Sequence, residues 1–220
     1  ELIKKGKVSV NSKVEVNPAV KVSEADDIVY EEKRVFPQKN LVYYLLNKPK
    51  NFITTTDDPE DRNTVLDLFK GVDTTRLYPV GRLDRNTTGL LLMTNDGELT
   101  HRLTHPQYEV EKEYLVDATG IFSQSKIARL EKGVLLAGRK AKADRVELLK
   151  KDGRNLQLKF ILHEGRKREV RRLCARVGWE VTRLVRVRLG NIELANLEPG
   201  TVRKLTEAEI RELKASVKLV

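Results

Sequence analysis

The order of strand-like and helix-like segments constrains the fold of this chain most. Apolar runs and alternating patterns of strand length predict six long strands: 41–49, 89–96, 111–120, 143–151, 155–163 and 180–189. Patterns with helical period predict four helices: 97–105, 123–133, 165–178 and 206–217. Asp152-Gly153 joins two of the strands as a hairpin, and the helices do not alternate with the strands as βαβ units require. The sequence therefore predicts an α+β fold with a largely antiparallel mixed sheet and flanking helices.

A chain of 220 residues, 40% of them hydrophobic, can form one sizeable domain and a small one. We expect the small domain over residues 1–32, where Gly6 ends a helix and valines alternate around an Asn11-Ser12 turn as in a hairpin. Residues 33–40 are polar, contain Pro37 and lack periodicity, so they are the predicted linker. The second domain is predicted to cover 41–220.

The charge of the chain indicates a polyanionic partner. The 42 Lys and Arg residues outnumber 32 Asp and Glu residues, which leaves a net charge of +10. Nucleic acid is the leading candidate, although such an excess can also serve solubility alone. A cluster of Lys4, Lys5 and Lys7 fits a solvated face and a phosphate-binding corner equally well. Aromatic residues are only 5% of the chain, so we do not expect a platform of many stacked bases.

Several kinds of site are not expected. Cys174 is the single cysteine and the three histidines are scattered, which argues against a disulfide framework and a metal site. No motif for a nicotinamide, nucleotide or metal cofactor is visible, so no cofactor is predicted. The sequence has neither an apolar run of membrane-spanning length nor a signal peptide, and we expect a soluble, cytoplasmic protein.

The predicted helix 165–178 carries an apolar stripe and an unusual group of cations. Its apolar residues follow the spacing of one buried face: Val170, Leu173, Cys174 and Val177. The first half carries five cations: Arg166, Lys167, Arg168, Arg171 and Arg172. Cations are unfavourable near a helix N-terminus, where the helix dipole is positive. We therefore expect phosphates to approach this end of the helix.

The predicted strand 180–189 repeats this pattern of arginines. Strict alternation places four side chains on one face: Thr182, Leu184, Arg186 and Arg188. Arginines spaced by two beside one apolar residue are typical of a cleft floor that meets a nucleic-acid backbone and one base.

Asp84 stands in the segment "GRLDRNTTGLLLMTNDGELTHRL". An aspartate between two arginines is most often a structural ion pair. Here, however, Gly81 allows an unusual backbone conformation, and Asn86-Thr87-Thr88-Gly89 predicts a turn rich in side-chain hydrogen bonds. A buried strand from Leu90 to Met93 would anchor this loop. Such support is typical of functional loops, and a carboxylate kept ionised by a nearby cation can act as a nucleophile or a base.

The segment 81–106 resembles the catalytic motif of the RsuA/RluB-type ribosomal RNA pseudouridine synthases, closest to the RluB branch. The resemblance extends from about Leu41 to the final helix, through "LNKPKN", "EKEYLV" and "EGRKREVRRLCARVGWEVTRLVRVRLGNIEL". It implies the pseudouridine synthase fold and the isomerisation of uridine to pseudouridine, with large-subunit 23S RNA as the expected substrate. "KKGKVSVNSKVEVNPAVKV" is similar to the latter part of an S4-type RNA-binding module.

The resemblance also implies roles for individual residues. Asp84 matches the essential aspartate, Tyr114 the tyrosine that packs against the uracil, and Leu184 the apolar residue of the uracil pocket. Arg171 matches the basic residue that pairs with the aspartate. Arg82 corresponds to an arginine that helps displace the target nucleotide from its stack. The implied partner is ribosomal RNA or a pre-ribosomal particle. No patch in the sequence argues for more than a monomer, and no small-molecule cofactor is expected.

The expected chemistry agrees with the residues, because this isomerisation exchanges an N–C for a C–C bond without net redox change. It needs an ionised carboxylate, a clamp for the uracil and a cation, and the nucleotide must leave its stack. Two alternatives differ in function. A non-catalytic RNA-binding or ribosome-assembly factor on the same fold would share all the basic features and differ only at Asp84. A glycosidase-like hydrolase would need Asp96 or Glu98 as a second acid, and a helix start already explains both.

Overall fold

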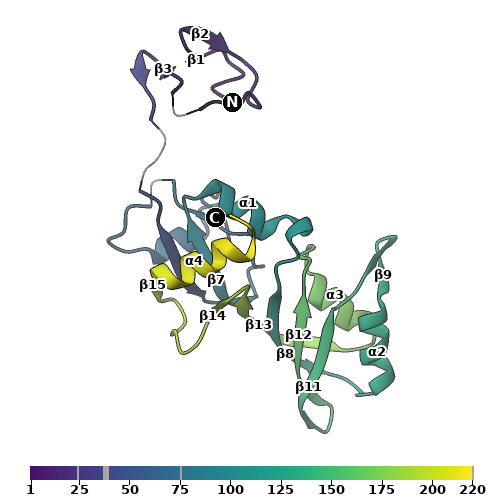
Figure 1. The fold of residues 1–220 in the computed structure, drawn as a ribbon. Helices are drawn as coiled ribbons and strands as arrows, with labels where there is room; N and C mark the ends of the chain where they lie inside the picture. The colour runs from purple at the N-terminus through teal and green to yellow at the C-terminus, as the bar shows by residue number, and fades with distance from the viewer. Residues whose placement is uncertain (24, 37–39, 75, 220) are drawn as a thin grey trace. The chain divides into compact units, whose positions relative to one another are not determined.

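The computed structural model describes residues 1–23, 25–36, 40–74 and 76–219, which form two compact units, Glu1–Leu41 and Val42–Val220. Figure 1 shows both units. No helix among the described residues is both long and apolar enough to cross a membrane.

The first unit is a four-stranded antiparallel sheet in the order β2-β1-β3-β4. Its strands are β1 (Val8–Val10), β2 (Lys13–Glu15), β3 (Ile28–Tyr30) and β4 (Lys33–Arg34). The predicted hairpin is confirmed, since β1 pairs with β2 across Asn11 and Ser12, which both have positive φ. The predicted helix end is a turn in which Lys5 N–H donates to the Glu1 carbonyl, and it ends at Gly6 with φ +68°. The linker prediction is wrong at Lys33 and Arg34, which pair with β3, while residues 37–39 of that segment lie outside the described residues.

The second unit is built on a nine-stranded mixed sheet with the central order β11-β12-β8-β13-β7-β5-β15. The long strands are β5 (Tyr43–Lys48), β7 (Thr88–Thr94), β8 (Lys112–Thr119), β11 (Arg145–Asp152), β12 (Asn155–Leu162) and β13 (Glu180–Leu189). Short strands complete it: β6 (Tyr78–Pro79), β14 (Ile192–Glu193) and β15 (Val202–Lys204). All pairings are antiparallel except that of β7 with β13. The predicted fold class, including its largely antiparallel mixed sheet, is confirmed.

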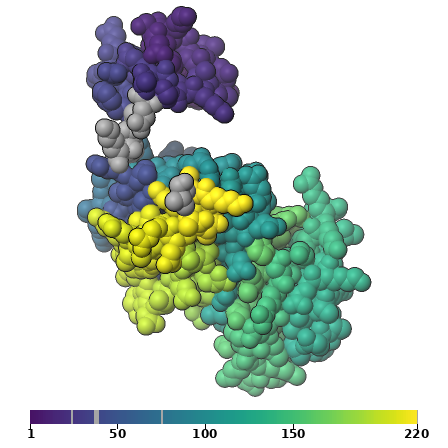
Figure 2. Space-filling model, in the orientation of Figure 1, coloured from purple at the N-terminus to yellow at the C-terminus, as the bar shows by residue number. Residues whose placement is uncertain are grey.

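The helices lie in two groups, one on each half of the sheet (Figure 1). They are α1 (Gly97–Thr104), α2 (Gln124–Lys132), α3 (Glu169–Arg176) and α4 (Glu207–Ser216), with 3-10 turns at Val65–Leu68 and Pro106–Tyr108. Leu99 of α1 and Leu213 of α4 pack against β5 and β7, whereas Leu130 of α2 and Leu173 of α3 pack against β8 and β12. Asp96 caps α1 by accepting the N–H of Leu99, as its position before the helix predicted. The space-filling view shows the green residues of α2 to β12 on one side of this unit and the yellow C-terminal residues on the other (Figure 2).

The strands β5 and β7 are buried on both faces. One face contacts α1 and α4, and the other contacts a cluster that includes Val65 and Phe69. This explains why their sequences are continuous apolar runs without the alternation typical of a half-exposed strand. A hairpin that sequence patterns did not predict, β9 (Val134–Leu136) with β10 (Arg139–Ala141), follows α2.

The parallel contact between β7 and β13 joins the two halves of the sheet at Gly89. Thr88 and Gly89 are in register with Val185 and Arg186. A Cβ on Gly89 would lie 2.2 Å from the Arg186 carbonyl oxygen and 2.9 Å from its nitrogen, and φ at Gly89 is +101°. A side chain at this position would therefore push the two strands apart.

We expect Gly89→Ala to lower the free energy of unfolding by more than about 3 kcal/mol, because a backbone clash adds to the strain of positive φ. Gly138→Ala is the matched control. Gly138 also has positive φ, +77°, but no heavy atom lies within 4 Å of its added Cβ. We expect that control to cost about 1 kcal/mol. Urea unfolding of both variants measures the difference, and equal losses would contradict the close-contact explanation.

Candidate active site

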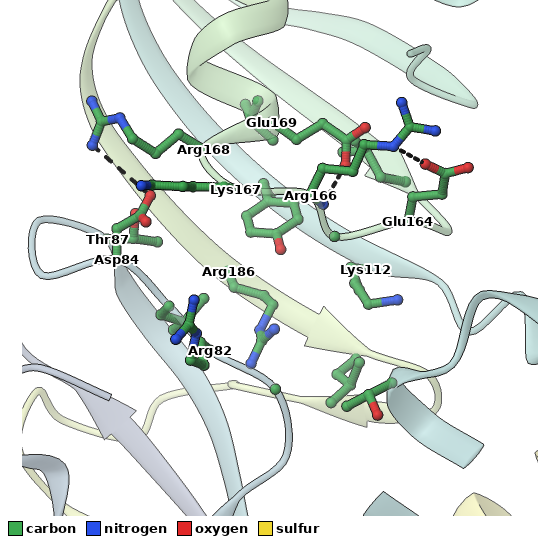
Figure 3. Close-up of a pocket in the computed structure, with 18 of the residues that line it drawn as sticks. Arg82, Asp84, Thr87, Lys112, Glu164, Arg166, Lys167, Arg168, Glu169 and Arg186 are labelled. Atoms are coloured by element: carbon green, nitrogen blue, oxygen red, sulfur yellow. Dashed lines mark hydrogen bonds and ion pairs between the residues drawn. The ribbon is translucent and has the colours of Figure 1, made fainter. Parts of the chain in front are cut away.

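A pocket of about 590 Å³ opens beside the contact between β7 and β13 (Figure 3). Its walls come from the loop before β7, from β8, from the end of β12, from the loop before α3 and from β13. Eight residues expected in the site line it: Arg82, Asp84, Tyr114, Arg166, Lys167, Arg168, Leu184 and Arg186. Segments that lie up to a hundred residues apart in the sequence thus meet at one place.

The buried ammonium group of Lys48 anchors the loop that carries Asp84. Lys48 has no exposed surface, and its Nζ donates to the carbonyl oxygens of Thr87 at 2.9 Å, Asp84 at 3.2 Å and Arg85 at 3.4 Å. It also lies 3.2 Å from the Pro49 carbonyl. Burial lowers the pKa of Lys48 to about 8, and the negative charge of Asp84 partly opposes this shift. One cation therefore holds three carbonyl groups of the short segment from Asp84 to Thr87.

Further hydrogen bonds hold the same loop. The Thr54 hydroxyl donates to the Leu83 carbonyl at 2.8 Å, and the Thr87 N–H donates to the Asp84 carbonyl at 3.0 Å. Gly81 has φ +74°, the unusual backbone conformation that its position suggested. The carboxylate of Asp84 is thus displayed by a loop whose backbone has little freedom.

The cation that the structure places at the Asp84 carboxylate is Arg168. Its Nη1 lies 4.0 Å from Asp84 Oδ2, and the aspartate side chain is 32% exposed. Arg171, the expected partner, donates instead to the carbonyl oxygens of Val181 at 3.0 Å and Asn86 at 3.2 Å. Burial lowers the pKa of Arg171, with the charge of Arg168 adding to the shift. Arg171 therefore ties the Asp84 loop to α3 and β13, and its expected direct ion pair with Asp84 is not formed.

Tyr114 and Leu184 face the same pocket from neighbouring strands. Tyr114 of β8 is half-buried, Leu184 of β13 is 5% exposed, and both line the cavity. β8 and β13 are antiparallel, with Leu184 opposite Val116 and Arg186 opposite Tyr114. An aromatic ring, a leucine and a carboxylate thus surround one space large enough for a nucleoside base.

Residues 42–176 match the family model described as RNA pseudouridylate synthase. The chain belongs to this family. It is 40% identical to "Ribosomal large subunit pseudouridine synthase B" of Bacillus subtilis over 98% of this chain and 88% of that protein. It is 41% identical to an uncharacterized RNA pseudouridine synthase of Aquifex aeolicus over 99% of this chain and 90% of that protein. A crystal structure of a pseudouridylate synthase superimposes with a TM-score of 0.72 at 32% identity and covers 96% of this chain and 90% of its own.

The basic loop of this RNA pseudouridine synthase is longer than its sequence suggested. The helix was predicted to start at residue 165, but α3 starts at Glu169, so Arg166, Lys167 and Arg168 lie in the preceding loop. Arg168 is in the left-handed region, with φ +53°, and the Glu169 carboxylate accepts the Arg166 N–H at 2.9 Å. These cations lie just before the helix N-terminus, where the positive end of the helix dipole still disfavours them. Arg172 lies on α3 itself, half-buried and outside the pocket lining.

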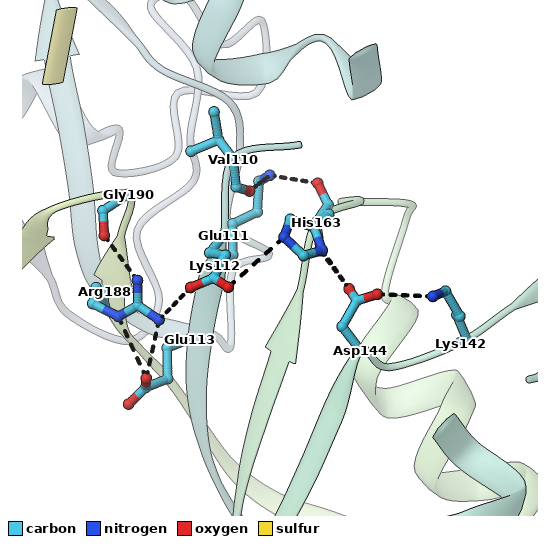
Figure 4. A network of polar contacts seen from close by, with 9 residues as sticks. All are labelled: Val110, Glu111, Lys112, Glu113, Lys142, Asp144, His163, Arg188 and Gly190. Atoms are coloured by element: carbon cyan, nitrogen blue, oxygen red, sulfur yellow. Dashed lines mark hydrogen bonds and ion pairs between the residues drawn. The ribbon is translucent and has the colours of Figure 1, made fainter. Parts of the chain in front are cut away.

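Two bulges in β13 overturn the expected alternation of its side chains. The register shifts between Val181 and Arg183 and again between Arg186 and Arg188. Arg186 therefore faces the pocket, almost completely buried, whereas Arg188 faces the other side and pairs with Glu111 at 2.9 Å and Glu113 at 3.3 Å (Figure 4). The prediction that both arginines lie on one face of the strand is wrong, because an extra residue in a strand reverses the alternation beyond it.

The lysines of the first unit contact acidic neighbours. Lys7 Nζ lies 2.9 Å from a Glu31 carboxylate oxygen, and Lys5 Nζ lies 4.0 Å from Glu1. All three lysines, Lys4 included, belong to the unit Glu1–Leu41 and are described with it.

Sequence reasoning missed Lys48, Lys112 and Glu169. Lys48 ends an apolar strand, and Lys112 precedes Tyr114 by two positions, so strand alternation alone would have placed Lys112 on the face of Tyr114. Glu169 is 5% exposed and burial raises its pKa. Among the described residues, no cluster of three or more His, Cys, Asp or Glu side chains could hold a metal ion.

We expect Lys48→Met to flatten the pH dependence of stability between pH 8 and 10. Burial lowers the pKa of Lys48 from 10.5 to about 8, so the unfolded chain binds more protons in this interval. The free energy of unfolding therefore rises with pH there. Removing Lys48 removes its part of that rise. Lys112, whose pKa burial and the charge of Arg186 lower to about 8, adds to the rise, whereas Cys174, whose pKa burial raises from 9.0 to about 12, opposes it.

Urea unfolding at several pH values measures this slope. Lys50→Met, the same change at an exposed lysine two residues away, should keep the full rise. Identical slopes in the wild type and in Lys48→Met would show that the ammonium titrates alike in the folded and unfolded chain.

Proposed function

We propose that this synthase isomerises a uridine of large-subunit ribosomal RNA and that Asp84 is the reacting carboxylate. The observation that carries the proposal is the meeting of Asp84, Tyr114 and Leu184 around one pocket, on elements distant in sequence. The Bacillus subtilis relative, named for the large ribosomal subunit, supports the choice of RNA. Ribosomal assembly is cytoplasmic in bacteria, and we expect a monomer that acts there.

The reaction breaks the bond from uracil N1 to the sugar C1′ and forms a bond from C5 to C1′. The hydrogen leaves C5 and a proton is gained at N1, so the atoms balance and no oxidant or reductant is needed. An ionised Asp84 can attack C1′ or remove a sugar proton. Both routes require the detached uracil to stay in place while it turns over. Tyr114 and Leu184 supply two walls that retain it and exclude water.

Arg168 and the anchored loop prepare Asp84 for this role. The Arg168 guanidinium group lies 4.0 Å from the Asp84 carboxylate, and both side chains are partly exposed. Lys48 and Arg171 donate to backbone carbonyls, including those of the loop, so they position Asp84 without forming ion pairs with it. A carboxylate held in one orientation loses little entropy when the substrate arrives.

The mouth of the pocket carries the cations for RNA. Arg82, Lys167 and Arg168 are exposed there, and Arg166 is half-buried with an ion pair to Glu164. These charges suit the backbone around a nucleotide that has left its stack, with Arg82 placed to fill the vacated space. We further propose that the first unit is an S4-like RNA-binding module in which Lys4, Lys5 and Lys7 contact phosphates.

Asp84→Asn should abolish release of tritium from [5-³H]uridine in ribosomal RNA, because the amide is neither a nucleophile nor a base. RNA binding should stay within about twofold of the wild type, because only one of many polar contacts changes. Asp117→Asn is the matched control. Asp117 lies on β8 and pairs with the exposed Arg183, so this variant should retain activity. Turnover by Asp84→Asn would refute the assignment of Asp84.

A wild-type protein that binds ribosomal RNA but releases no tritium would support the alternative, a ribosome-assembly factor without turnover. Mapping of pseudouridines in ribosomal RNA from a strain that lacks the gene identifies the target. Loss of a small-subunit site, with all large-subunit sites retained, would redirect the proposal to the other RNA.

Lys167→Ala should weaken RNA binding and reduce the slope of log K against log salt by about 0.7 to 0.9, the share of one phosphate contact. Lys150→Ala removes an exposed lysine from β11, outside the pocket, and should leave the slope unchanged. Affinity measured from 50 to 200 mM salt distinguishes the two. A slope that Lys167→Ala does not change would mean that this lysine contacts no phosphate.

A further inference from the structure

Two buried cations on the floor of the pocket have no part in the steps described above. Lys112 is 9% exposed and Arg186 is 3% exposed, and both line the cavity. In the close-up, Arg186 lies between Asp84 and Lys112 (Figure 3). Buried Lys and Arg side chains are rare unless an anion or a set of acceptors compensates them.

Their strand positions place these cations next to the uracil clamp. Arg186 is directly opposite Tyr114 in the register of β13 and β8, and Lys112 is two residues before Tyr114 on the same face of β8. Two residues of a strand span about 6.8 Å. Leu184 is likewise two residues before Arg186. A nucleotide with its base between Tyr114 and Leu184 therefore has its sugar and phosphates within reach of this pair.

Each cation keeps donors that the protein does not use. Arg186 Nε donates to the Leu90 carbonyl at 2.8 Å, but its Nη2 is enclosed and finds no acceptor in the described part of the chain. Lys112 Nζ donates to the carbonyl oxygens of Val110 at 2.7 Å and His163 at 2.8 Å (Figure 4). An ammonium group has three N–H bonds, so one of them is left for a ligand.

The charges around the pair are not balanced by the protein. After burial, the positive charge of Arg186 is the largest influence that lowers the pKa of Lys112, which shows that the two cations repel each other. The acid that acts on Lys112 is Glu169, and burial raises the pKa of its carboxyl. Of the acids that line the pocket, Glu169 alone offsets this repulsion at Lys112, so an additional anion would relieve it.

We propose that Lys112 and Arg186 form a subsite for one backbone phosphate of the nucleotide that carries the reacting uracil. The permanent anions of RNA are its phosphates, whereas uracil is neutral before the glycosidic bond breaks. The guanidinium fork and the free ammonium N–H suit phosphate oxygens. This subsite fixes the sugar while the uracil turns over, and it rests on the proposed function.

The test asks whether the effect of removing each cation depends on the charge of one particular phosphate. The substrate is a stem-loop RNA with the mapped target uridine, in which the 5′ or the 3′ phosphate of that nucleotide is replaced by a neutral methylphosphonate. Single-turnover assays measure the RNA concentration that gives half the maximal rate. In the wild type we expect one of the two replacements to raise it about tenfold, the effect of one charged contact.

On unmodified RNA, Lys112→Met and Arg186→Met should each raise the RNA concentration at half the maximal rate about tenfold. On the methylphosphonate RNA that weakens the wild type, the two variants should cause little further rise. Arg183→Met is the control, because its side chain is 71% exposed on the same strand, and its effect should add to that of the methylphosphonate. Thermal unfolding checks the fold of each variant. If Arg186→Met is unfolded, Lys112→Met and Arg186→Lys carry the test.

Additive losses at both phosphates would overturn the subsite. A fall in the maximal rate that is equal on native and methylphosphonate RNA would also overturn it, because the cations would then act on the uracil. A second measurement needs no turnover. Calorimetry should show that uridine 3′,5′-bisphosphate binds the wild type at least about tenfold more tightly than uridine, and that both variants lose this preference.

If the wild type binds uridine 3′,5′-bisphosphate and uridine with equal affinity, the subsite is refuted, even if tritium release is normal. Conversely, a wild type that converts no uridine but prefers the bisphosphate through these two residues would refute the proposed function alone. The two failures can therefore be distinguished.

Discussion

The close parallel contact of β7 and β13 is the constraint on which the site depends. It joins two half-sheets that are otherwise built from antiparallel neighbours, and it forms only because Gly89 lacks a Cβ where the Arg186 backbone passes. The Asp84 loop leads directly into β7, while Leu184 and Arg186 belong to β13. A shift at this contact would move the carboxylate and the pocket floor relative to each other, which is the displacement that catalysis tolerates least.

Positive charge serves two different purposes in this synthase. Lys48 is buried and Arg171 is half-buried, and both donate to backbone carbonyls of the loop that displays Asp84. At the mouth, Lys167 and Arg168 are exposed, and we propose that they contact RNA. A buried cation with enough acceptors rigidifies a loop, whereas an exposed one gives salt-dependent affinity. The net charge of +10 includes both kinds of cation and does not distinguish between them.

Local sequence patterns were sufficient to predict most of the helices and strands. The hairpin of β11 and β12, the capped helix α1 and the doubly buried β7 follow from turn residues, a capping aspartate and a continuous apolar run. The start of α3 could not be predicted in this way, because it depends on Glu169 folding back onto the Arg166 N–H. The bulges of β13 could not be predicted either, because the alternation of residues in the sequence does not indicate where an extra residue is inserted.

The sequence by itself determined the fold class, the family and the loop that carries Asp84, because turn chemistry, apolar periodicity and a long ordered motif are all local in the chain. Only the tertiary structure decided which cation lies beside that carboxylate, and that Arg186 faces the pocket while Arg188 turns away to Glu111 and Glu113. The reason is physical. Charges interact through space and burial, and the distances between side chains of different strands depend on register, which one additional residue can reverse.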